Sequence, residues 1–166
     1  MERRGFLKST LTFFSWGILS GLALVPGVGH LLSPVLRKSA PDDEWHLLGT
    51  IDEFPSGSVS VKTLHLVVRD GWERRIQEQT VFVLNRDEAP MVLSSVCPHL
   101  SCPVNFDSGT QQFHCPCHQS FWKDNGARLR GPSPRNLDPL PTQIRDGQIY
   151  CRWVNFRPNL PEPVEV

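Results

Sequence analysis

The chain lacks net charge, internal repeats and low-complexity segments, and these absences narrow the classes to which it can belong. Its 17 basic residues balance its 17 acidic residues, so bulk charge predicts neither a nucleic-acid partner nor an acidic protein partner. Beyond residue 36, no long segment shows helical periodicity, so the rest of the chain is not predicted to be helical.

Charge is also missing locally, because residues 9–36 contain no Asp, Glu, Lys or Arg. About 20 mostly apolar residues are enough to span a bilayer core as a helix. We therefore predict a transmembrane anchor over residues 11–36. Pro26 and Gly27 fall late in this stretch, where a kink or a helix end is tolerable in lipid only if the freed backbone groups find partners.

The apolar stretch is preceded by three basic residues, Arg3, Arg4 and Lys8. By the positive-inside rule, segment 1–10 is cytoplasmic and the chain after the anchor lies on the extracytoplasmic, periplasmic side of the plasma membrane. Segment 1–10 also resembles a twin-arginine export signal, the route for proteins that fold around a cofactor before export. A cleaved signal peptide is the alternative, but residues 26–41 offer no convincing small-x-small cleavage site.

Two short segments concentrate cysteine and histidine: residues 97–102 (Cys-Pro-His-Leu-Ser-Cys) and 115–120 (Cys-Pro-Cys-His-Gln-Ser). Each offers one Cys and one His at close spacing, namely Cys97 with His99, and Cys115 with His118. A binuclear centre held by two thiolates and two imidazoles needs two facing loops that each reach both irons. The pattern therefore predicts a [2Fe-2S] centre, with one further cysteine in each segment.

Two other interpretations of these residues remain open. Cys2His2 is also a tetrahedral zinc set, although zinc modules rarely leave two more cysteines placed to cross-link the same loops. Pairing all five cysteines as plain disulfides would leave the histidines unexplained and one thiol odd. Cys151 lies in an alternating apolar run over residues 148–154, which favours a buried core residue.

The motifs C-x-H-x2-C and C-P-C-H-x-S resemble those of the Rieske iron-sulfur proteins. The resemblance implies that one iron of a [2Fe-2S] cluster is bound by two cysteines and the other by two histidines: Cys97 and Cys115, His99 and His118. It also implies a disulfide between Cys102 and Cys117. Residues 131–134 (Gly-Pro-Ser-Pro) resemble the family's proline loop, which covers the cluster from a third side.

The chain departs from the family pattern beside these residues. Ser120 is present, and the resemblance implies that its hydroxyl bonds a cluster sulfur. Gln119 stands where the family usually has Gly, Ser101 likewise replaces a usual Gly, and Trp122 occupies the position of a Tyr whose hydroxyl bonds a second sulfur. Because an indole offers a single donor of different reach, we predict a lower reduction potential, which would suit menaquinol.

The predicted fold class is all-β. Short runs rich in Val, Leu, Ile, Phe and Trp alternate with turn residues, and the strands are expected at 45–51, 59–69, 80–85, 91–96, 111–115 and 148–156. The resemblance implies an antiparallel β-sandwich Rieske head, preceded by the single transmembrane helix. The expected order is a linker at 37–44, the Rieske domain at 45–156 with an inserted cluster-binding subdomain at about 95–136, and a C-terminal tail at 157–166.

Membrane-anchored Rieske proteins are subunits of quinol:cytochrome c reductases of the bc1 and b6f class. The resemblance therefore implies one electron-carrying subunit of a multisubunit oxidoreductase, with a cytochrome b subunit, a c-type cytochrome and a quinol (menaquinol or ubiquinol) as partners. His118 would be the quinol-facing ligand, and Leu100 would lie near the cluster and the docking surface.

The chief alternative is a Rieske small subunit of a periplasmic oxidoreductase such as arsenite oxidase, which would need no permanent quinol site. A ferredoxin of an aromatic-ring dioxygenase is disfavoured, because such ferredoxins are soluble, cytoplasmic and need no disulfide.

Overall fold

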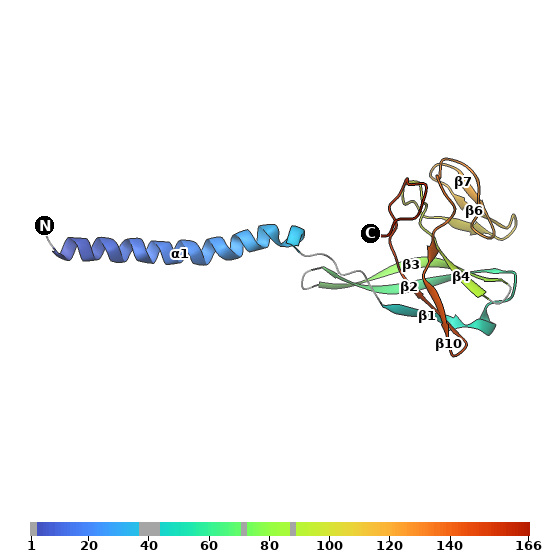
Figure 1. Ribbon diagram of the computed structural model, residues 1–166, viewed down its shortest axis with the longest axis horizontal. Helices are drawn as coiled ribbons and strands as arrows, with labels where there is room; N and C mark the ends of the chain where they lie inside the picture. The colour runs from blue at the N-terminus through green and yellow to red at the C-terminus, as the bar shows by residue number, and fades with distance from the viewer. Residues whose placement is uncertain (1–2, 37–43, 71–72, 87–88) are drawn as a thin grey trace. The chain divides into compact units, whose positions relative to one another are not determined.

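The computed structural model describes residues 3–36, 44–70, 73–86 and 89–166. The chain divides into two units, Met1–Ala40 and Pro41–Val166, and each is described by itself (Figure 1). Of the predicted linker at 37–44, only Glu44 lies within the described residues. Of the predicted cytoplasmic segment, residues 3–10 form the first turns of a helix and residues 1–2 lie outside the described part.

The first unit consists of one long helix, α1 (Arg3–Leu36), which continues through Pro26. Within it, Phe13–His30 is long and apolar enough to cross a membrane by length and composition, and none of that window is buried in the chain. The hydroxyls of Ser15 and Ser20 donate to the carbonyls of Leu11 and Trp16, one turn back. These bonds satisfy polar groups that an apolar surrounding would otherwise leave unpaired.

The second unit, which we call the head, is built from antiparallel strands and one short 3-10 turn (Ile51–Glu53). The strands are β1 (Trp45–Thr50), β2 (Val59–Asp70), β3 (Glu73–Arg86), β4 (Ala89–Ser94), β5 (Asn105–Asp107), β6 (Gln112–Cys115), β7 (Ser120–Lys123), β8 (Arg128–Arg130), β9 (Pro139–Leu140), β10 (Thr142–Arg145) and β11 (Gln148–Arg152). They form three sheets, ordered β1-β11-β10, β2-β3-β4-β9 and β5-β6-β7-β8. The all-β expectation is thus confirmed.

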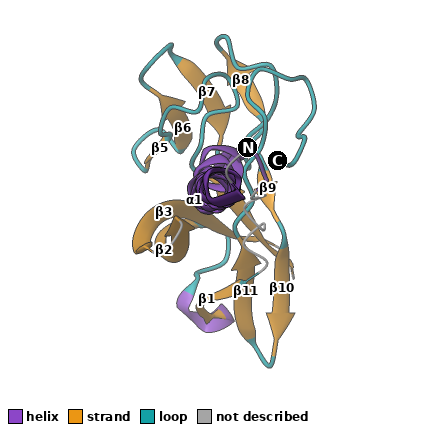
Figure 2. Cartoon of the chain, turned by 90° about the vertical axis from the view of Figure 1, so that its left-hand side faces the viewer, coloured by secondary structure: helices purple, strands orange, loops and turns teal. Residues whose placement is uncertain are grey.

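The sheet that contains β3 is the middle layer of the head (Figure 2). Residues 81–84 of β3 (Val-Phe-Val-Leu) are all buried, and they alternate between two hydrophobic cores. Val81 and Val83 face a core shared with the β1-β11-β10 sheet, whereas Phe82 and Leu84 face a core shared with β6 and β7. A continuous apolar run is what a strand covered on both faces requires.

Both cores contain buried cysteines. Cys151, predicted to be a core residue, is fully buried in the first core. Cys97 and Cys115 belong to the second core, together with Phe113 and Trp122. The second core therefore lies directly behind both Cys/His segments and sets their position on the head.

The sequence missed several strands that the structure contains. The N-terminal half of β3, residues 73–79, is mostly polar and forms a strand because it pairs residue by residue with β2, from Asp70↔Glu73 to Thr63↔Thr80. The strands β5, β7 and β8 are only three or four residues long, too short to show alternation. They complete the small sheet that carries the second Cys/His segment.

Candidate metal centre

The first motif loop, residues 97–102, follows β4 and is tied together by its own backbone. The Cys97 N–H donates to the Cys102 carbonyl at 2.8 Å, and the Ser101 N–H donates to the Cys97 carbonyl at 2.9 Å. Ser101 adopts a left-handed φ of 59°, a conformation for which the family's usual Gly is better suited. Cys97 and Pro98 are buried, and Leu100 is exposed.

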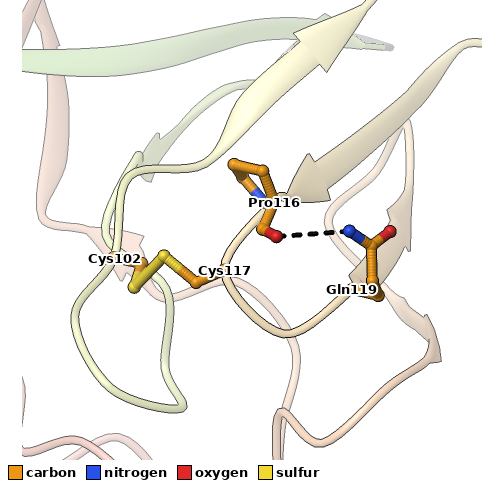
Figure 3. Close-up of a disulfide and its surroundings, with 4 residues drawn as sticks. All are labelled: Cys102, Pro116, Cys117 and Gln119. Atoms are coloured by element: carbon orange, nitrogen blue, oxygen red, sulfur yellow. Dashed lines mark hydrogen bonds between the residues drawn. A yellow bond between two sulfur atoms is a disulfide. The ribbon is translucent and has the colours of Figure 1, made fainter.

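The second motif loop, residues 115–120, is the turn of the β6–β7 hairpin. Its ends pair as Cys115↔Ser120, and residues 116–119 between them are exposed. Gln119 also has a left-handed φ, of 57°. Its side-chain amide donates to the Pro116 carbonyl at 3.2 Å (Figure 3), and its Oε1 lies 3.1 Å from His114 Nε2. The Gln119 side chain therefore braces this turn in addition to the backbone pairing of its two ends.

The two motif loops meet at one end of the head. The predicted disulfide between Cys102 and Cys117 is present and joins them, with the two Cα atoms 6.5 Å apart (Figure 3). The imidazole rings of His99 and His118 lie edge to face with centroids 4.9 Å apart. His118 is exposed, whereas His99 is only half-buried and its Nδ1 is a buried nitrogen without a hydrogen-bond partner among the described residues.

Cys97 and Cys115 are free, buried thiols that lie next to each other. Burial raises the pKa of the Cys97 thiol to about 11; backbone N–H groups of His99 and Leu100 act against the rise, and the Cys115 thiol adds to it. Two adjacent buried thiols of this kind become thiolates readily only beside a cation. The sulfurs of Cys102, Cys115 and Cys117 also lie within 4.8 Å of one another, but two of them are bonded together and are not free ligands.

The proline loop, residues 131–134, packs closely on the second motif loop. Gly131 has a φ of 103°, and a Cβ there would lie 2.5 Å from the Gln119 carbonyl oxygen and 2.5 Å from the Ser120 Cα. The Ser133 N–H donates to Ser120 Oγ at 3.1 Å. Glycine is needed at position 131 because only a residue without a side chain allows this approach.

Trp122 fills the core behind the second motif loop and is completely buried. Its indole Nε1–H donates to the Arg135 carbonyl at 3.1 Å. The single N–H donor of the Trp122 side chain is therefore occupied by the Arg135 carbonyl. A tyrosine at this position would carry a hydroxyl instead.

The sequence analysis missed three residues that support the loops. Gln119 was noted only as a replacement for Gly, and its contact with His114 depends on the β6–β7 pairing. Arg135 and Asp138 form a buried ion pair, with Nε to Oδ1 at 2.6 Å. Charged residues in a proline-rich segment carry no sequence signal for burial, so this pair could not have been found from the residues alone.

The residues fit a cluster that needs mixed sulfur and nitrogen donors. The two disulfide-linked loops carry a pair of adjacent free thiols and a pair of touching imidazoles, and the partnerless Nδ1 of His99 is a nitrogen that a metal would satisfy. Such a Cys2His2 set is the ligand set of a Rieske [2Fe-2S] centre. The disulfide joins the two loops that carry these ligands, and the proline loop packs on the second of them.

Comparison with known proteins agrees with this geometry. Residues 44–142 match the profile of the Rieske [2Fe-2S] domain. The chain is 28% identical over 154 residues to the menaquinol:cytochrome c reductase iron-sulfur subunit of Bacillus subtilis, covering 90% of each chain. It is 32% identical over 150 residues to the cytochrome b6-f complex iron-sulfur subunit of Chlorobaculum thiosulfatiphilum, covering 89% of this chain and 74% of the relative.

Among solved structures, the cyanobacterial plasma membrane Rieske protein PetC3 from Synechocystis matches with a TM-score of 0.44 and 24% identity, over 65% of this chain and 99% of that chain.

Proposed function

Because this chain belongs to the Rieske [2Fe-2S] domain family, we propose that it is the iron-sulfur subunit of a membrane quinol:cytochrome c reductase of the bc1 or b6f type. In this role it takes one electron, with a proton, from quinol and passes the electron to a c-type cytochrome. The relatives are bc- and b6f-type subunits, which favours this function over the small subunit of an arsenite oxidase.

The proposed cluster ligands are Cys97 and Cys115 on one iron and His99 and His118 on the other. When bound, a Rieske cluster accepts and returns a single electron at a potential of about −150 to +300 mV. Ser120 is proposed to donate its hydroxyl hydrogen toward the cluster, since its Oγ already accepts the Ser133 N–H. The observation that carries the proposal is that two disulfide-linked loops carry two adjacent buried thiols and two touching imidazoles.

His118 is proposed as the quinol-facing ligand. Of the two histidines it is the exposed one, and its ring lies against the half-buried ring of His99. A quinol hydroxyl can therefore approach His118 without displacing any part of the head. The exposed side chain of Leu100, on the other loop, offers apolar contact for the quinone ring or for the cytochrome b subunit.

The proposed partners are a cytochrome b subunit, a c-type cytochrome and a quinol, within a multisubunit complex. Menaquinol is favoured, because the Bacillus subtilis relative that matches over 90% of each chain is named for that substrate. Helix α1 is proposed as the single membrane anchor, with its N-terminus in the cytoplasm and the head on the other side. Residues 37–44 then connect the anchor to the Rieske domain at 45–156, whose cluster-binding part is about 95–136.

Low-temperature EPR of dithionite-reduced membranes tests this function. We expect a Rieske-type signal that changes on addition of a quinone-site inhibitor, and its loss in Cys115→Ser and His118→Ala. Cys151→Ala and His65→Ala are the matched controls. Cys151 lies in the other core, and His65 is an exposed residue of β2. A native protein that bound only zinc, or a signal that survived Cys115→Ser, would overturn the proposal.

A further inference from the structure

Arg135 is a buried arginine whose guanidinium contacts three other residues. It makes a two-point ion pair with Asp138, Nε to Oδ1 at 2.6 Å and Nη2 to Oδ2 at 2.8 Å. Nη1 donates to the Leu160 carbonyl at 2.7 Å, and Nη2 also donates to the Arg157 carbonyl at 3.1 Å. A planar guanidinium can fill all of these positions at once, whereas a lysine ammonium cannot.

The two carbonyls that Arg135 holds belong to the C-terminal tail, residues 157–166, on either side of Asn159. The Asn159 N–H donates to the carbonyl of Pro98 at 2.7 Å. Pro98 lies between Cys97 and His99 in the first motif loop, and it is itself buried. The tail therefore links Arg135 to this loop through a single backbone hydrogen bond.

The backbone of the same segment reaches the second motif loop as well. The Arg135 carbonyl accepts from Trp122 Nε1 and from Ser133 Oγ, and the Ser133 N–H donates to Ser120 Oγ. The Asp138 carbonyl accepts from the Ser94 N–H, at the end of β4 just before the first motif loop. The Arg135–Asp138 pair thus lies at a junction of both motif loops, the proline loop and the tail.

We propose that the tail is a fourth support of the metal centre, beside the two motif loops and the proline loop. In this proposal Arg135 is a positioning residue, which holds the first motif loop in place through Asn159. The inference rests on the proposed function and its ligand set, and the tail that it invokes lies beyond the matched range 44–142. Its physical basis is that a buried ion pair is rigid only while both partners and all their hydrogen bonds are kept.

Position 159 offers a matched pair of variants. Asn159 has a left-handed φ of 57°, so Asn159→Gly keeps both the backbone shape and the N–H. Asn159→Pro removes the N–H and cannot adopt this φ. In the full-length, cluster-loaded protein we expect Asn159→Pro to lose its visible absorbance about two- to tenfold faster in mild denaturant, and to exchange the Ser101 amide hydrogen faster. Asn159→Gly should match the native protein in both measurements.

Arg135→Lys provides a second, independent test. This substitution should also increase the rate of cluster loss. In the Asn159→Pro background the further increase in rate should be much smaller than in the native chain, because the two residues act through one link. The inference is overturned if the two Asn159 variants behave alike or if the effects of Arg135→Lys and Asn159→Pro simply add. Absence of any Rieske-type EPR signal from the native protein would instead overturn the proposed function.

Discussion

The two motif loops carry the same kinds of residue, each with a histidine, a proline and two cysteines, but they differ in burial and in what supports them. In the first loop, Cys97 and Pro98 are buried, and the loop is held by its own backbone bonds and by the tail. In the second loop, residues 116–119 are all exposed, and the turn is braced by the Gln119 side chain and by the proline loop. Similar ligand motifs have thus been placed in different surroundings.

This difference separates two tasks. The first loop begins in the buried core and its histidine is half-buried, although Leu100 is exposed. The second loop presents His118 to solvent, where a partner can reach it. An electron carrier that must be both stable and accessible gains from such a division, because a partner can then reach the exposed histidine of one loop without disturbing the buried residues of the other.

The largest effect is expected from removing the disulfide that joins the two loops. Cys102 and Cys117 are 15 residues apart, and a cross-link closing a loop of that size contributes about 3 kcal/mol. We expect the double change Cys102→Ala and Cys117→Ala to lower the free energy of unfolding by about 2–4 kcal/mol, measured by urea titration. Amide hydrogen exchange should rise more in the exposed second loop than in the first.

The control for this change is Cys151→Ala, which removes a buried sulfur that forms no cross-link. Its cost should be about 1 kcal/mol, with no difference between the loops. Equal loosening of both motif loops after loss of the disulfide would contradict the contrast drawn between them.

A smaller effect, confined to the second loop, is expected from Gly131→Ala. The new Cβ would lie 2.5 Å from backbone atoms of Gln119 and Ser120, at a φ of 103°, so the proline loop must move away. We expect a loss of about 2–3 kcal/mol in unfolding free energy and faster loss of the cluster absorbance.

Gly147→Ala is the matched control for that substitution. Gly147 also has a positive φ, of 73°, but a Cβ there meets nothing within 4 Å. Its cost should be about 1 kcal/mol, from backbone strain alone. If both alanine variants lost the cluster at the same rate, close packing of the proline loop would not be the cause.

The features that could be predicted from the sequence are those made by residues that are neighbours in the chain. The Cys and His residues of each loop are neighbours in the chain, so their spacing was enough to predict that the loops meet and, with the family resemblance, that Cys102 pairs with Cys117. The strand runs over 80–85 and 91–96 were visible because a sheet buried on both faces needs continuous apolar residues.

The supports could not be predicted, because they depend on pairings between distant segments. Asn159 reaches Pro98 through a backbone N–H, a group that every residue except proline carries. Arg135 has no feature that distinguishes it in sequence from the exposed Arg128. Residues 73–79 form a strand only because β2 lies opposite them. Tertiary contacts, rather than residue type, decide each of these cases.

A modest effect on reduction potential is expected at Trp122, behind the second loop. In the family a tyrosine hydroxyl donates to a cluster sulfur, whereas the indole N–H of Trp122 is used on the Arg135 carbonyl. We expect Trp122→Tyr to raise the midpoint potential by about 40 mV, since one hydrogen bond worth about 1 kcal/mol favours the reduced form by that amount. Protein-film voltammetry measures this shift.

Trp122→Phe is the matched control, because it changes the ring without adding a hydroxyl. It should leave the potential within about 10 mV of the native value, since no new donor faces the cluster. In this variant the Arg135 carbonyl loses the hydrogen bond from the indole but keeps the one from Ser133 Oγ. The backbone at Arg135 is therefore not expected to move far. A rise in Trp122→Phe equal to that in Trp122→Tyr would assign the effect to packing.

The smallest change in stability is expected at Gln119, where two effects oppose each other. A left-handed φ costs a residue other than glycine about 1 kcal/mol, and Gln119→Gly relieves that strain at φ 57°. The same substitution removes the contacts with Pro116 and His114, which together are worth about the same amount. The unfolding free energy should therefore change by less than about 0.5 kcal/mol.

The mobility of the second motif loop should nevertheless differ between the native protein and Gln119→Gly, because glycine removes the backbone strain and the side-chain bracing together. In Gln119→Gly, amide exchange should rise in residues 116–119 and stay unchanged in the first motif loop, whose supports do not involve this side chain. Gln119→Asn is the control that keeps an amide and tolerates a positive φ, but it is too short to make both contacts. Equal exchange in native and glycine forms would mean that the proline loop alone holds the exposed turn.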